Sequence, residues 1–161
     1  MHLNPLLIVL AVALVSRVAQ AQIPDLNPGP NMSPEQVVQY QISALQHNDD
    51  PAPDAGIERA FRFASPKNKE FTGPLARFAQ IVKGPAYSSL LNCLSSSVVG
   101  STASPGTAAV YVRIVTSGGR RVAYVFILSK QIEGEFANCW MTDSVSPVDS
   151  GEDATGEGVT I

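Results

Sequence analysis

Histidine and cysteine, on which most metal sites and nucleophilic active sites depend, are scarce in this sequence. The 161 residues include two histidines and two cysteines, Cys93 and Cys139. Neither cysteine has a second cysteine or a histidine at ligand spacing, so we expect no metal site and no cofactor. A Gly-x-Ser-x-Gly motif, a glycine-rich phosphate loop and a His-x-x-x-His pair are also missing. His47 falls where a helix is expected to end, so we expect it to offset the helix dipole.

Excess positive charge is missing as well. The formal net charge is −3. Acidic and basic residues balance over 22–145, because the excess acidic residues of the chain all lie after residue 145. A neutral domain has no long-range field that attracts phosphates, so we do not expect nucleic-acid binding. The segment 146–161 is acidic, rich in glycine and poor in large apolar residues, which predicts a disordered tail. Its role is either to keep the protein soluble or to bind a partner.

Long apolar runs occur only near the N-terminus. Residues 6–15 (LLIVLAVALV) are followed by Arg17 and by Ala-Gln-Ala at 19–21, which is typical of a signal-peptidase site. The run is about half of the roughly 20 residues that cross a bilayer. We therefore expect a cleavable signal peptide over 1–21, a secreted, lumenal or periplasmic protein, and no stable membrane anchor. An organelle presequence or a short anchor is the alternative.

Three helices are expected to begin a single α+β domain over residues 33–145, after a Pro/Asn-rich arm at 22–32. The first begins with Ser33 as N-cap in a capping box with Gln36. A second begins at Asp54 and stops at Ser65-Pro66, and a third covers 72–83. The apolar positions on one face of each are Val38, Ile42 and Leu45, then Ile57, Ala60, Phe61 and Ala64, then Leu75, Phe78, Ala79 and Val82.

After Tyr87 the pattern becomes β-branched and alternating. It predicts strands near 90–99, 107–116, 121–130 and 136–145, joined by hairpins. Helices followed by hairpin-linked strands are typical of an α+β fold in which three helices cover a curved, four-stranded antiparallel sheet.

The turns fix which residues face one another. If Gly118-Gly119 form a two-residue turn, Arg113 pairs with Tyr124. A turn at 133–134 pairs Asp143 with Tyr124, which completes a row across three strands. With Tyr111 on the same face, we predict a partly apolar ligand-binding pocket formed by Tyr111, Arg113, Tyr124 and Asp143. The alternative is a structural ion pair packed under the helices.

The expected sheet also bears on the cysteines and on assembly. In a sequential meander, Cys93 and Cys139 lie on the first and fourth strands, three spacings of about 4.8 Å apart. That separation exceeds disulfide reach, so we expect them to be unpaired with each other. Both sheet faces are largely apolar, and the helices cover only one of them. We therefore expect a homodimer through the other face.

Several segments resemble a known family. The segments 60–66 (AFRFASP), 72–78 (TGPLARF) and 82–87 (VKGPAY) resemble the family known as domain of unknown function 4864, and 139–143 (CWMTD) is similar to its last strand. The resemblance covers roughly 33–145 and implies an NTF2-like or cystatin-like cone, without implying an activity. Arg77 matches an arginine of the family and is either an exposed helix charge or a pocket residue.

The sequence leaves two hypotheses about function. The first is an exported, non-catalytic domain that binds a small apolar ligand or another protein. The second is an enzyme of the NTF2-like kind, in which Tyr111, Arg113, Tyr124 and Asp143 handle protons and orient a small, partly apolar substrate. NTF2-like enzymes often use an Asp-His pair inside the cone, and the strands of this sequence contain no histidine. That difference favours the binding domain.

Overall fold

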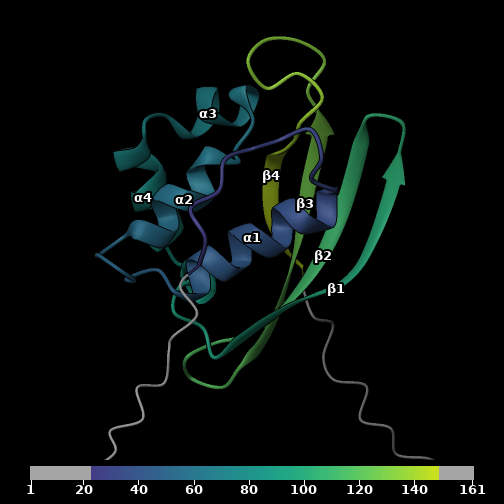
Figure 1. Cartoon of the computed structure of the whole chain (residues 1–161). Coiled ribbons are helices and arrows are strands. Elements are labelled where there is room, and N and C mark those ends of the chain that lie inside the picture. The colour runs from purple at the N-terminus through teal and green to yellow at the C-terminus, as the bar shows by residue number, and fades with distance from the viewer. Residues whose placement is uncertain (1–22, 149–161) are drawn as a thin grey trace, which may run out of the picture.

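The computed structural model describes residues 23–148, and its chain order is four α-helices, one short 3-10 helix and four strands (Figure 1). The strands are antiparallel in the order β1-β2-β3-β4, which confirms the α+β class. The predicted signal peptide over 1–21 lies outside the described residues. The elements are α1 (Pro34–Gln46), α2 (Ala55–Arg62), α3 (Pro66–Thr72), α4 (Leu75–Lys83), η1 (Ser88–Leu90), β1 (Ser95–Ser104), β2 (Thr107–Val115), β3 (Arg121–Lys130) and β4 (Trp140–Val148).

The helices form one layer against one face of the sheet. Helix α1 crosses the strands and contacts β1, β2 and β4, while α2, α3 and α4 lie beside it on the β4 side (Figure 1). Helix α2 packs on α1, and α4 packs on α2 and α3. The core lies between α1 and alternate residues of β2 and β3. Its sheet side consists of Val110, Val112, Ile114, Tyr124, Phe126 and Leu128, each at most 3% exposed.

The helices begin close to where the sequence predicts, but one helix is missing from the prediction. Ser33 forms the predicted capping box: its hydroxyl accepts from Gln36 N at 3.3 Å, and Gln36 Oε1 accepts from Ser33 N at 2.8 Å. Helix α3 is not among the predicted helices, because Ser65-Pro66 indicates the end of the preceding helix. Ser65 is the N-cap of α3 and accepts from Asn68 N at 3.1 Å, with Pro66 at the first helical position. The chain therefore has four helices, and the predicted third helix begins at Leu75.

The predicted β2-β3 register is wrong by one residue. Arg113 pairs with Ala123, and Val112 pairs with Tyr124. The turn is one residue longer than predicted: Thr116 N donates to Arg120 O at 2.8 Å, and Gly119 takes the positive φ (82°) that closes a three-residue loop. A slip of one residue exchanges the two faces of a strand. Tyr124 therefore lies on the helix-covered face and Arg113 on the other.

The predicted β3-β4 register is wrong as well. Tyr124 pairs with Pro147, and the ladder shifts by one residue between Ile127 and Leu128, which leaves Asp143 as the extra residue of a β-bulge. Strand β4 begins at Trp140 and continues past residue 145 to Val148, into the segment expected to be tail. The predicted row of Arg113, Tyr124 and Asp143 therefore does not form.

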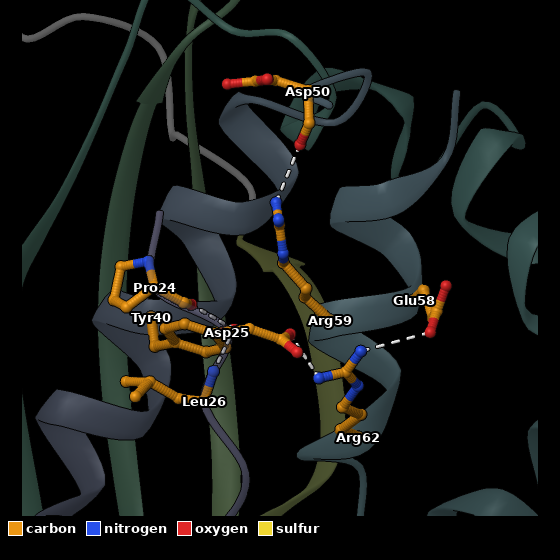
Figure 2. A network of polar contacts seen from close by, with 8 residues as sticks. All are labelled: Pro24, Asp25, Leu26, Tyr40, Asp50, Glu58, Arg59 and Arg62. Atoms are coloured by element: carbon orange, nitrogen blue, oxygen red, sulfur yellow. Dashed lines mark hydrogen bonds and ion pairs between the residues drawn. The ribbon is translucent and has the colours of Figure 1, made fainter. Parts of the chain in front are cut away.

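The arm is packed on the helices. Ile23 lies against the core, and Figure 2 shows the polar contacts of the next three residues. The Tyr40 hydroxyl donates to Pro24 O at 3.0 Å and accepts from Leu26 N at 3.1 Å. Between these two residues, Asp25 forms an ion pair with Arg62, which also binds Glu58 one turn earlier on α2. The proline-rich composition of the arm does not predict this packing, because the residues that bind the arm, a buried tyrosine and an arginine, lie far from it in the sequence.

Candidate functional site

A cleft of about 570 Å³ opens between α3, α4 and the middle of β3 and β4. This volume lies within the range of small-molecule pockets. Helix α1 contributes to the floor through Gln41 and Leu45. The lining is mainly apolar, and it includes Leu45, Phe78, Ile81, Val82, Leu90 and Phe126.

The cleft is left open because α4 packs mainly against α2 and α3 and not against the strands. Only Val82 of α4 is fully buried. Phe78 and Ile81 are half-buried and line the cleft, while Leu75 is 36% exposed. The apolar face that the sequence predicts for this helix is therefore only partly used for folding. Its remainder is available to a ligand.

The floor of the cleft contains a buried polar network. The Thr142 hydroxyl of β4 donates to Gln41 Oε1 of α1 at 2.7 Å, and Gln41 Nε2 donates to Ala60 O at 3.0 Å. Asn68 of α3 donates from its side-chain amide to Thr142 O at 3.1 Å. All three side chains are at most 9% exposed. Because these bonds join α1, α2, α3 and β4, they fix the shape of the floor.

The rim carries two charges of opposite sign. Lys67 lies exposed at the second position of α3 and forms no ion pair within residues 23–148. Asp143 lies half-buried at the β-bulge, where one carboxylate oxygen accepts from the Ser129 hydroxyl at 3.0 Å. Phe71 of α3 also lies at the rim and is 71% exposed. Such a rim can bind a polar end group above an apolar floor.

The structure separates the four predicted site residues. Tyr111 and Arg113 lie exposed on the sheet face away from the helices. Tyr124 is buried under the helices and donates to Ala86 O at 2.9 Å, and burial raises its pKa. Only Asp143 lines the cleft. Sequence reasoning missed Lys67 and Phe71 because α3 was not predicted, although Ser65-Pro66 carried the signal for its start.

The remaining candidates lie outside the cleft. Cys93 and Cys139 are both free and buried, and burial raises the pKa of Cys93, which keeps its thiol protonated. Arg77 is exposed on α4 and does not line the cleft. His47 caps the C-terminus of α1, with its Nδ1 3.0 Å from Ser43 O.

Across residues 23–148, no group of three or more histidine, cysteine or acidic side chains is placed to hold a metal ion. In that same range, none of the helices has the length and apolar character that a membrane span requires.

Comparison with protein families gives a match, whereas comparison with individual proteins does not. No curated protein and no solved structure matches this chain. The model of one family, described as Domain of unknown function (DUF4864), matches residues 31–153, which is most of the chain. This match confirms the resemblance that the FASP, GPxxRF and CWMTD segments indicated. The chain is a member of the DUF4864 family, and within this member the cleft between α3, α4 and β4 is the candidate site.

Proposed function

We propose that this protein is an exported, non-catalytic binding domain whose cleft takes a small ligand with an apolar body and a polar end group. The observation that carries this proposal is the apolar cleft with Lys67 and Asp143 at its rim. Export is supported by the apolar run at 6–15 and the Ala-Gln-Ala at 19–21. N-terminal sequencing of the protein recovered outside the producing cells tests it, since a first residue other than Gln22 or a neighbour would contradict the cleavage.

The ligand's apolar body is supported by the half-buried side chains Phe78, Ile81 and Tyr87. Each methylene group that a ligand buries there contributes about 0.8 kcal/mol. The polar floor offers few free groups, because Gln41 and Asn68 already bind Thr142. The end group therefore belongs at the rim, where the ammonium group of Lys67 donates and the free oxygen of Asp143 accepts.

The enzyme hypothesis has no reacting centre in this arrangement. It required Tyr111, Arg113, Tyr124 and Asp143 to converge, and they lie on opposite sheet faces or at the bulge. No histidine lines the cleft, and Asp143 is held by the Ser129 hydroxyl. The geometry favours binding over proton transfer.

Replacing Phe71 with alanine is expected to weaken ligand binding about tenfold, which is what losing roughly 1.4 kcal/mol of apolar contact produces. Folding should be little affected, because this side chain is 71% exposed. The measurement is the shift of melting temperature produced by a panel of straight-chain carboxylates, amines and alcohols, followed by titration of the compounds that bind.

The matched control is Ile132→Ala, which removes an apolar side chain that is 92% exposed and lies outside the cleft. Lys67→Gln and Lys130→Gln form a second pair, of which only the first should change the preference for carboxylates. The proposal fails if no compound shifts the wild-type protein, or if Phe71→Ala and Ile132→Ala respond equally.

The predicted homodimer stays a prediction about the sheet face away from the helices. Tyr111 is 42% and Ile127 37% exposed there, with Val125 half-buried between them, but Arg113 makes the face less apolar than expected. A stable dimer needs about 800 Å² of surface from each partner. Light scattering at micromolar concentration should give a dimer mass, and Tyr111→Lys should give a monomer, with Leu94→Lys as control. A monomer mass for the wild-type protein would refute the dimer.

A further inference from the structure

A second hollow, of about 410 Å³, lies where β3 begins and β4 ends. Arg120 and Arg121 approach it from the β2-β3 hairpin, and Ser89 approaches from the segment around η1. Pro147 and Val148 of β4 complete its rim. No acidic side chain lines this arginine hollow, so its charge is entirely positive.

The two arginines have no acidic partner in the described part of the chain. The ion pairs formed within residues 23–148 involve Arg62 and Lys83 instead. Both Arg120 and Arg121 are exposed, and they are adjacent in the sequence. Guanidinium groups that have no acidic partner attract carboxylates, which they bind with paired N–H donors.

The chain itself supplies carboxylates at this position. Val148 lines the arginine hollow and pairs with Ala123, two residues after Arg121. The sequence that follows begins with an acid and contains no lysine or arginine up to its last residue, Ile161. Its acids are Asp149, Glu152, Asp153 and Glu157. A tether this short gives these carboxylates a local concentration on the order of millimolar near the arginines.

We propose that the arginine hollow is the docking site of the chain's own acidic segment, residues 149–157. Charge complementarity and the short tether from Val148 select this occupant over a free anion, which would have to compete from dilute solution. Exposed ion pairs are weak and are screened by salt. The docked segment is therefore readily displaced, and an anionic partner that displaces it gains access to both arginines.

The test compares amide NMR spectra of the ¹⁵N-labelled chain 22–161 at about 20 mM and about 500 mM NaCl, a range over which screening removes exposed ion pairs. In the wild-type protein the amide signals of Asp149, Glu152 and Asp153 should move with salt. In the double variant Arg120→Gln/Arg121→Gln, these amide signals should have, already at low salt, the chemical shifts that the wild-type protein shows at high salt. Arg113→Gln, which removes an exposed arginine of the same sheet outside the hollow, should behave as wild type.

A reciprocal variant keeps the arginines and neutralises the acids, by Asp149→Asn, Glu152→Gln, Asp153→Asn and Glu157→Gln. Signals of Ser89, Arg120 and Arg121 should then move to the positions they take in wild-type protein at high salt. The proposal is overturned if the amide signals of residues 149–157 do not change with salt concentration. It is also overturned if Arg113→Gln moves these signals to their high-salt positions. It is also overturned if tenfold dilution releases them, because the occupant would then be the segment of a second copy.

Discussion

Replacing Gly56 with alanine is expected to lower the free energy of unfolding by about 3 kcal/mol or more, the upper range for overpacking a tight contact. A Cβ atom at this position would lie 2.0 Å from Ala44 O and 2.7 Å from the Cα atom of Asn48. Both atoms belong to the backbone at the end of α1, so no side chain can rotate away. Alanine would otherwise favour the helix by up to about 1 kcal/mol, so the two effects have opposite signs and the clash is the larger.

The contact matters because it sets how closely α2 approaches α1. Gly56 N donates to Asn48 O at 2.8 Å, and the next amide, of Ile57, donates to Asn48 Oδ1 at 3.0 Å. Both bonds hold the first turn of α2 against the end of α1. Because α4 stands on α2, a displacement of α2 also moves the wall of the cleft. Gly56→Ala should therefore weaken ligand binding as well as stability.

Gly100→Ala is the matched control for this substitution. Gly100 lies in β1 with no atom within 4 Å of the added Cβ, so we expect its free energy of unfolding to change by no more than about 0.5 kcal/mol. Urea denaturation of both variants gives the two values directly. Equal stabilities for Gly56→Ala and Gly100→Ala would show that the α1-α2 contact is looser than the structure has it.

The strands were predictable from the sequence where their signal is local. Strands β2 and β3 lie within one residue of the expected ranges, because each is a continuous apolar stretch bounded by glycine turns. Strand β1 begins five residues later than expected, at Ser95. The apolar residues from Leu90 to Leu94 belong to η1 and to a turn in which Asn92 has positive φ (49°). The strand itself is mostly serine, threonine and alanine at an edge of the sheet, and such residues carry no apolar period.

The candidate site was not predictable from the same signals. Which side chains meet depends on register, and one extra residue in the turn before Arg120 moved Tyr124 to the opposite face from Arg113. The bulge at Asp143 is a shift in the β3-β4 ladder, which no local pattern encodes. The cleft depends on α4 packing against α2 and α3 and not against the sheet. The spacing of apolar residues along α4 predicts only that one side of the helix is apolar. A binding site that depends on turn length, a β-bulge and helix packing can be identified only from the tertiary structure.

Replacing Thr142 with valine is expected to lower the free energy of unfolding by about 2 kcal/mol, within the range for leaving a buried polar atom unpaired. Valine has nearly the same shape, so the change removes only the hydroxyl that donates to Gln41 Oε1. The main-chain bonds of Thr142 to Phe63 and Ser65 remain. The loss therefore measures the side-chain bond, and Thr102→Val on the exposed edge strand should cost less than about 0.5 kcal/mol.

The double variant Gln41→Leu/Thr142→Val separates the hydrogen bond from its surroundings. If Thr142→Val is costly because Gln41 Oε1 is stranded, removing that oxygen should recover part of the loss, with a coupling of about 1 kcal/mol between the two sites. Gln41 also donates to Ala60 O, so the recovery should be incomplete. Additive effects would contradict a bond between α1 and β4. Since that bond closes the floor of the cleft, coupling in stability should be accompanied by weaker ligand binding in Thr142→Val alone.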